Sequence, residues 1–286
     1  MKTEGEKEYY EERSFKDYTA KVWRDSETLD CVLQVLRYGI PIYEMKKGPG
    51  GKFEIEHIFK VAEDDLKKIG SQSITTSAYS LGKDITGRGR PNLVIRAWTG
   101  GAHCCFDFYI FELAKEITLV AEIHGEDGED SFLADLDGDD VAEFVGRDYA
   151  FAYWRTGFAQ SPAPRVILRF QDGGYFVAGD LMATLAPSGE EIEKRVQEIR
   201  KDEEWEHGDP PEALWAFMLD LTYSGRADLV PDFCRKAWPE DVPGMDEFLE
   251  DFRAQLKMSQ YWDQILDMNG GQILQEWLTD KVGVRT

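Results

Sequence analysis

The sequence has no run of about 18 consecutive apolar residues, which is the length that a membrane-spanning helix needs. Its amino-terminal stretch, MKTEGEKEYYEERSFKDY, is charged throughout and lacks the apolar core of a signal peptide. These two absences predict a chain that does not insert into a membrane and that resides in the cytoplasm. If a signal peptide has been removed, the same features fit a periplasmic or secreted protein.

Basic residues are in short supply. The chain of 286 residues has 33 Lys and Arg against 55 Asp and Glu, which gives a net charge of -22. A charge of this sign repels phosphate backbones and anionic lipid headgroups. We therefore expect no nucleic-acid partner, and we expect cations or basic molecules to be favoured instead.

Cysteine is also scarce, since Cys31, Cys104, Cys105 and Cys234 are too few and too scattered for a disulfide scaffold. The adjacent pair in GGAHCCF has three interpretations. The two thiols are buried on a strand, or one of them forms a disulfide with Cys31 or with its neighbour, or both bind a soft metal together with His103. Consecutive side chains on a strand point to opposite faces, which disfavours the metal site.

Known catalytic motifs are missing as well: the sequence contains no GxSxG, GxxxxGK[ST] or HExxH pattern. The four histidines are scattered, although His103 and His124 could approach each other on neighbouring strands. The sequence therefore favours a non-catalytic binding or interaction protein, with an unidentified protein or carbohydrate partner and an undetermined oligomeric state. The alternative is a hydrolase or redox enzyme that uses the region His103-Cys104-Cys105.

The pattern from residue 17 to residue 186 is short apolar stretches separated by turns. The stretches are rich in β-branched and aromatic residues, which is typical of strands. They group into three sets of four, which predicts about three antiparallel meanders, and residues 1–16 are expected to be a flexible segment. The expected strands are 19–24, 28–36, 41–45 and 52–58; 73–81, 92–98, 105–113 and 117–123; and 131–136, 142–154, 165–170 and 175–179.

The character changes over residues 187–286, where apolar residues recur at helical spacing. Ser188 followed by Glu191 is the pattern of a capping box, in which each residue satisfies a backbone N–H at the start of a helix. Leu214, Phe217, Met218 and Leu221 lie on one face of a later helix. The expected fold class is therefore mainly β with a helical C-terminal part, the latter a small α-helical bundle.

The most chemically explicit segment is DLDGDDVAEF, which begins at Asp135. Carboxylates at alternating positions, with a glycine for the bend, are what a hard cation such as Ca²⁺ requires. Without a cation, clustered carboxylates repel one another and raise each other's pKa values. The segment is either a calcium loop or a solvated acidic turn, and its spacing favours the ion.

The pattern Asp-x-Asp-Gly-Asp-x-x-x-Glu between two strands resembles the calcium loop of FG-GAP and VCBS repeats. The resemblance implies integrin-like, propeller-like blades, and it implies Ca²⁺ as the bound ion. Carried over position by position, the implied ligands are Asp135, Asp137, Asp139, Val141 and Glu143. One departure is Asp140 at position six, where that family usually has glycine; a left-handed backbone there would carry a cost.

A degenerate copy of this loop begins 51 residues earlier, at Asp84. Thr86 is at position three, Arg88 at position five and Asn92 at position nine. A guanidinium cannot coordinate a cation, so we expect this loop to be free of metal. The Arg88 side chain could instead occupy the space of the ion and bridge the loop carboxylate. The two copies together predict a repeat.

An aromatic stretch follows the acidic loop, with Tyr149, Phe151, Tyr153, Trp154 and Phe158 near Arg155. Such faces could bind a sugar or an extended peptide. The favoured interpretation is that Tyr149, Phe151 and Tyr153 line one face and pack against the helical domain.

Overall fold

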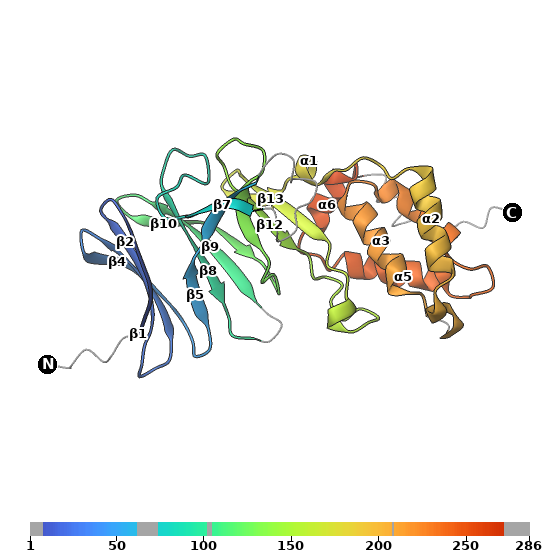
Figure 1. The fold of residues 1–286 in the computed structure, drawn as a ribbon, viewed down its shortest axis with the longest axis horizontal. Coiled ribbons are helices and arrows are strands. Elements are labelled where there is room, and N and C mark those ends of the chain that lie inside the picture. Colours follow the sequence, from blue (N-terminus) through green and yellow to red (C-terminus); the bar gives the residue numbers. More distant parts are fainter. Residues whose placement is uncertain (1–7, 62–73, 102–104, 208, 272–286) are drawn as a thin grey trace. The chain divides into compact units, whose positions relative to one another are not determined.

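The computed structural model of the protein describes residues 8–61, 74–101, 105–207 and 209–271 (Figure 1). The chain divides into two compact units. The β unit comprises Met1–Gly146 with Leu168–Phe176, and the helical unit comprises Arg147–Ile167 with Val177–Thr286. The fold class predicted from the sequence, mainly β with a helical C-terminal part, is confirmed.

The first sheet of the β unit is an antiparallel meander in the order β1-β2-β3-β4. Its strands are β1 (Glu8–Phe15), β2 (Tyr18–Arg24), β3 (Cys31–Arg37) and β4 (Ile40–Lys47). Residues 8–15 therefore form a strand paired with β2, which corrects the prediction of a flexible segment over residues 1–16. The charged sequence hid this strand, because an edge strand is held largely by backbone hydrogen bonds, which need no apolar side chains.

The second sheet has the order β10-β9-β8-β5 and is antiparallel. Its strands are β5 (Lys52–Ile55), β8 (Asn92–Trp98), β9 (Phe106–Leu113) and β10 (Ile117–His124). Nearly every residue of β8 and β9 is buried. Their sequences are accordingly mostly apolar, as expected for strands that are covered on both faces, with Asn92, Arg96, Asp107 and Glu112 as the polar exceptions.

The third sheet has the order β14-β13-β12-β11-β6-β7. Its strands are β6 (His57–Val61), β7 (Ile74–Tyr79), β11 (Phe132–Asp135), β12 (Glu143–Arg147), β13 (Arg165–Gln171) and β14 (Gly174–Val177). The pairing of β11 with β6 is parallel, whereas β11 with β12 and β6 with β7 are antiparallel.

The predicted strands exist, but their predicted grouping into three sets of four is wrong. The stretch 52–58 crosses from the second sheet to the third at Glu56, whose N–H donates to Val94 and whose carbonyl accepts from Ser80. As a result β5 joins the second sheet, while β6 and β7 join the third. In place of 52–58, the first meander is completed by β1.

The sheets of the β unit pack face to face. A single apolar cluster joins the first and second sheets, and its members include Val22 and Leu33 on one side and Phe53 and Phe111 on the other. The second and third sheets meet at Phe108 and Phe144, whose rings lie 5.0 Å apart. The second sheet thus lies between the other two, as Figure 1 shows.

The helical unit contains six α-helices among its described residues, and none of them is long and apolar enough to span a membrane. They are α1 (Gly179–Met182), α2 (Gly189–Arg200), α3 (Glu212–Tyr223), α4 (Val230–Ala237), α5 (Met245–Leu256) and α6 (Trp262–Met268). Leu214, Met218 and Leu221 of α3 are buried, which confirms their predicted shared face. The predicted helical stretch 273–282 lies outside the described residues.

Residues 147–167, which the strand pattern assigns to a β domain ending at residue 186, group with the helices. Phe151 and Trp154 explain this. The ring of Phe151 contacts that of Phe252 at 5.1 Å, and the ring of Trp154 contacts that of Trp215 at 5.5 Å. The favoured packing interpretation is confirmed for Phe151 and is wrong for Tyr153, which is 61% exposed.

The capping box predicted at the start of α2 is present. The Ser188 hydroxyl accepts from the Glu191 N–H, and the Glu191 carboxylate accepts from the Ser188 N–H at 2.7 Å. These hydrogen bonds lower the pKa of the Glu191 carboxyl. The prediction succeeded because a capping box depends only on residues within one turn of helix.

Replacing Ser188 by alanine should lower the free energy of unfolding by about 1 kcal/mol, because the Glu191 N–H loses its acceptor and the Glu191 carboxylate loses the hydroxyl donor. Urea unfolding followed by tryptophan fluorescence would measure the change. Ser188→Thr is the matched control, since it keeps a hydroxyl and should remain near the wild type. Equal losses in the two variants would contradict a capping role for the hydroxyl.

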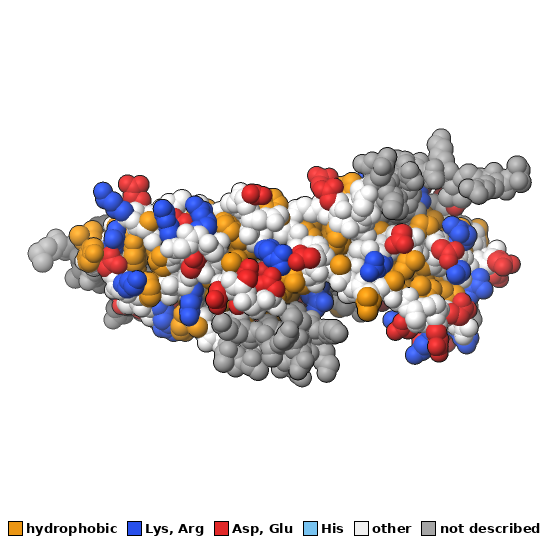
Figure 2. Space-filling model, turned by 90° about the horizontal axis from the view of Figure 1, so that it is seen from above, with side chains coloured by type: hydrophobic (Ala, Val, Ile, Leu, Met, Phe, Trp, Pro, Cys, Tyr) orange, Lys and Arg blue, Asp and Glu red, His pale blue; other side chains and the backbone are white. Residues whose placement is uncertain are grey.

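Side chains of both charge signs are interspersed on the face drawn in Figure 2. The net charge of -22 is therefore not gathered into one acidic patch on that face.

Candidate metal centre

The acidic loop connects two adjacent antiparallel strands of the third sheet. Asp135 is the last residue of β11, Glu143 is the first residue of β12, and Ala134 is the register partner of Glu143. Residues 136–142 form a turn in which Gly138 has φ +81° and Asp140 has φ +65°. Position six is thus left-handed, so Asp140 holds the conformation that glycine adopts most readily.

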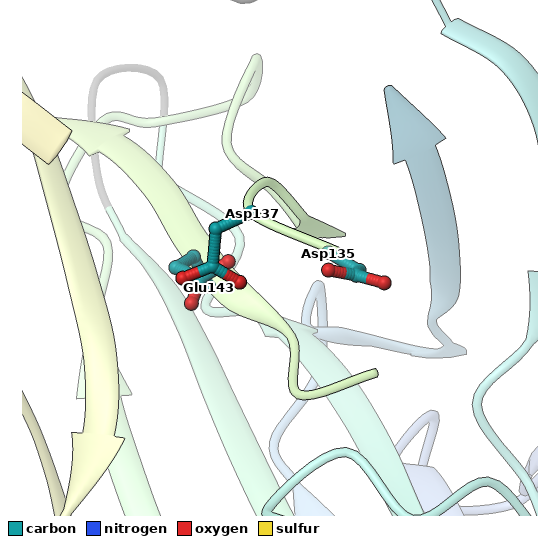
Figure 3. A group of neighbouring side chains, drawn as sticks. All are labelled: Asp135, Asp137 and Glu143. Atoms are coloured by element: carbon teal, nitrogen blue, oxygen red, sulfur yellow. The ribbon is translucent and has the colours of Figure 1, made fainter. Parts of the chain in front are cut away.

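Three of the five predicted ligand residues bring their carboxylates together. One oxygen from each of Asp135, Asp137 and Glu143 lies within 4.8 Å of the others, and Figure 3 shows the three side chains around the turn. Calcium–oxygen bonds are about 2.3–2.6 Å long, so two oxygens on one ion lie at most about 5 Å apart. The separation of the three carboxylates therefore falls within the reach of one Ca²⁺.

Hydrogen bonds within the turn involve Asp139 and Val141, the other two predicted ligands, as well as Asp135. The Asp139 carboxylate accepts a hydrogen bond from the Val141 N–H at 2.7 Å, and Asp139 does not belong to the convergent group. The Asp135 carboxylate accepts from the Gly138 N–H, also at 2.7 Å. The turn is thus organised by its own carboxylates, which receive backbone N–H groups.

Glu143 is the centre of the group and is fully buried, with a side-chain exposure of 0%. Its Oε2 accepts from the Leu136 N–H at 2.9 Å, and its Oε1 accepts from Arg169 Nε at 3.2 Å. Burial raises the pKa of the Glu143 carboxyl, against the opposing effect of those two donors. A charge at this position therefore needs nearby cations.

Arg169 was not predicted to belong to the site. It lies on β13, next to β12 in the sheet, and its Nη2 donates to Asp137 at 2.8 Å. The only signal in the sequence is an arginine inside the apolar strand RVILRF. That signal shows that the charge needs a partner, but it does not identify a partner 32 residues away.

The degenerate copy at residues 84–92 has the same backbone. Its position-nine side chain, Asn92, accepts from the position-two N–H of Ile85 at 2.9 Å, as Glu143 does from Leu136. Gly87 and Gly89, at positions four and six, have φ +67° and +75°. The repeat predicted from spacing alone therefore has a structural counterpart.

The two loops also contact each other. The Ala142 N–H of the acidic loop donates to the Ile85 carbonyl of the first loop at 3.0 Å. A Cβ added at Gly87 would lie 2.9 Å from Cγ2 of Val141. The two loops therefore pack directly against each other.

The Arg88 side chain does not bridge the carboxylate of its own loop. Asp84 accepts from the backbone N–H groups of Arg88 and Gly89, at 3.2 and 2.6 Å. The Arg88 guanidinium lies 3.6 Å from Glu112 on β9 instead, and Arg90 also pairs with Glu112. Because the Asp84 carboxylate already accepts from these backbone N–H groups, the Arg88 side chain extends toward the neighbouring strand β9.

The second predicted region is described only in part, because His103 and Cys104 lie outside the described residues. Cys105 is disulfide-bonded, whereas Cys31 is a free thiol buried in the core between the first and second sheets. The proposed pairing with Cys31 is therefore wrong, since that thiol is enclosed by apolar side chains. Nδ1 of His124 lies 3.1 Å from a carboxylate oxygen of Asp107, within hydrogen-bonding distance.

The remaining described thiol is Cys234, which is free and buried in the helical unit. Burial raises its pKa to about 12, and it raises the pKa of Cys31 as well. Neither residue supplies a thiolate near neutral pH, so neither has the character of a nucleophile.

No family model, curated protein or solved structure matches this chain.

Proposed function

We propose that this protein is a non-catalytic binding or interaction protein whose acidic loop, residues 135–143, binds one Ca²⁺. The observation that carries the proposal is the convergence of Asp135, Asp137 and Glu143 within 4.8 Å. The ion holds the end of β11 to the start of β12 and so stabilises the third sheet. The partner is a protein or a carbohydrate, and the β unit supplies a rigid scaffold for recognising it.

Two features support calcium over a solvated turn. A solvated acidic turn has no need to place a fully buried carboxylate, Glu143, among its acidic residues. The same backbone also occurs at residues 84–92 with Thr86, Arg88 and Asn92 in place of acidic residues, so the acidic side chains are not required to form the turn. Their presence in one copy alone indicates a separate role.

Propeller-like blades are the finer part of the proposed architecture. Face-to-face packing of three sheets supports it, as does the recurrence of one loop type at a spacing of 51 residues. A partial stack of this kind leaves the edges of its end sheets without further strands, and such edges attract other strands unless they are covered. This is one reason to expect a binding partner.

The non-catalytic part of the proposal is supported by the state of the described nucleophiles. Cys31 and Cys234 are buried thiols, and Cys105 is disulfide-bonded. His57 contacts Ser77, and its ring packs at a tilt against the ring of Tyr79 with the centroids 4.1 Å apart, which is a structural environment. These residues show no nucleophile paired with a base.

Calcium should raise the melting temperature of the full chain relative to a sample in EDTA. A ligand that binds the folded state stabilises it by about 2.7 kcal/mol at a concentration 100 times its Kd. Asp135→Asn should reduce this shift, because it removes one of the three converging charges. Thermal unfolding followed by tryptophan fluorescence, with and without millimolar CaCl2, measures both.

Asp84→Asn is the matched control, since it makes the same change in the loop that lacks the acidic set. Its calcium shift should equal that of the wild type. If wild-type protein melts at the same temperature in EDTA and in millimolar calcium, the calcium site does not exist.

A further inference from the structure

The cation already present at the acidic loop is the side chain of Arg169. Its guanidinium contacts two of the three converging carboxylates, with Nη2 2.8 Å from Asp137 and Nε 3.2 Å from Glu143. Its side chain is 25% exposed, so the pair with Glu143 is largely removed from water. A guanidinium has donors in a rigid plane and can bridge two carboxylates in this way.

The first loop has the same kind of pairing with the charges exchanged. There the cations, Arg88 and Arg90, belong to the loop, and the carboxylate, Glu112, lies on the neighbouring strand β9. Glu112 is the register partner of Asn92, the position-nine residue. In the acidic loop the carboxylates belong to the loop and the cation comes from the neighbouring strand β13.

Each copy of the loop is therefore tied to the next strand by a guanidinium and a carboxylate. In the first copy the carboxylate comes from outside the loop, and the Asp84 oxygens are occupied by backbone N–H groups. In the second copy the guanidinium contacts the same side chains that converge on a common point. In the second copy, therefore, a free metal ion and the arginine would bind the same carboxylates, those of Asp137 and Glu143.

We propose that Arg169 is a built-in competitor of the ion, so that the acidic loop exchanges between an arginine-bound state and a calcium-bound state. This inference rests on the proposed calcium function. A divalent ion bonded to Asp137 and Glu143 would lie close to the guanidinium, and like charges at such distances repel strongly in a partly buried site. The ion binds when the guanidinium withdraws from the two carboxylates.

Two consequences follow for the behaviour of the site. The calcium affinity of the natural protein is lower than its carboxylates alone would give, because the ion must displace Arg169. When calcium is low, the guanidinium also reduces the repulsion between Asp137 and Glu143, which helps to keep the turn intact. Arg169 therefore sets the calcium concentration at which the loop changes state.

Arg169→Gln removes the competing charge and tests this directly. Isothermal titration of the full chain with CaCl2, in buffer freed of divalent ions, should show an affinity at least tenfold higher than that of the wild type. Arg169→Lys keeps the charge but loses the planar fork, so its affinity should fall between the two. In EDTA, Arg169→Gln should melt at a lower temperature than wild type, and calcium should restore it.

Arg147→Gln is the control for a general change in net charge. Arg147 lies on the same strand as Glu143, four residues further on, which is about 13 Å along an extended chain. Its calcium affinity should stay within threefold of wild type. An equal gain in Arg147→Gln and Arg169→Gln would overturn the proposal, because only long-range charge would then be at work.

The remaining outcomes separate this inference from the proposed function. If wild type binds calcium and Arg169→Gln binds it no more tightly, the competition is wrong and the calcium function stands. If only Arg169→Gln binds, the competition is supported and calcium is not a ligand of the natural protein. If neither binds, both proposals fail. Should Arg169→Gln not fold, Arg169→Lys is measured against the same expectations.

Discussion

Replacing Asp148 by alanine is expected to lower the free energy of unfolding of the helical unit by about 3–5 kcal/mol. Asp148 is 1% exposed, and its carboxylate is the shared acceptor of a buried polar network. Oδ2 accepts from the hydroxyls of Tyr223 and Ser259, and Oδ1 accepts from the Ala150 N–H at 2.8 Å. Alanine would leave these three donors without their acceptor.

The network matters because it joins three segments that are distant in the sequence. Asp148 follows β12, Tyr223 ends α3, and Ser259 follows α5. Burial raises the pKa of the Tyr223 hydroxyl well above its ordinary value, with Asp148 adding to the effect. The phenol therefore stays protonated and remains a donor, which indicates a structural role for this group of side chains.

Tyr223→Phe is the graded comparison for Asp148→Ala. It removes one donor and leaves the carboxylate its other two partners, so a smaller loss of about 1–3 kcal/mol is expected. Urea unfolding followed by tryptophan fluorescence suits this unit, which contains Trp154, Trp205, Trp215, Trp238 and Trp262. A loss under about 0.5 kcal/mol for Asp148→Ala, typical of an exposed site, would contradict the network's role.

Local features of this chain were predictable from the sequence, and their partners were not. The capping box of Ser188 and Glu191 depends on residues three apart, and it was predicted correctly. The strand over 52–58 was also recognised, but its division between two sheets at Glu56 depends on Val94 and Ser80. Such partners are chosen by packing between distant segments, and a local pattern of β-branched residues does not encode them.

The candidate site shows the same division. The spacing of the acidic residues predicted correctly that the carboxylates of Asp135, Asp137 and Glu143 lie together across a tight turn between two paired strands. It also placed Asp139 among the ligands, and Asp139 does not belong to the convergent group. Arg169 was missed because its approach depends on the placement of β13 beside β12. Strand order in a sheet is a tertiary property, so the counter-charge of the loop could be identified only in the structure.

The burial of Asp148 illustrates a further limit. In the sequence it lies in the segment AEFVGRDYAFAYW, whose content of aromatic residues suggested a continuous strand over 142–154. The strand ends at Arg147, and Tyr153 and Arg155 adopt left-handed backbone conformations, with φ +61° and +56°. The chain leaves the sheet because the hydroxyl donors to Asp148, on Tyr223 and Ser259, and the ring that contacts Phe151, on Phe252, belong to the helical unit.

Replacing Glu143 by glutamine is expected to weaken calcium binding at least a hundredfold while the fold is kept. Glutamine retains an oxygen that can accept from the Leu136 N–H, just as Asn92 does for Ile85 in the first loop. It lacks the charge, however, and an ion that Asp135 and Asp137 hold together with Glu143 would lose its most buried ligand. A hundredfold loss corresponds to about 2.8 kcal/mol of binding free energy.

Glu143→Ala separates the ion-binding role of this side chain from its structural role. Alanine removes the charge and the acceptor together, so Leu136 N–H and Arg169 Nε lose a buried partner. We expect it to lower the free energy of unfolding in EDTA by about 2–4 kcal/mol, and Glu143→Gln to lower it by less than half as much. Calcium titration and urea unfolding of both variants measure the two effects independently. Unchanged calcium affinity in Glu143→Gln would show that the ion is held without this carboxylate. Equal destabilisation by the two variants would show that the hydrogen bond from Leu136 contributes nothing to stability.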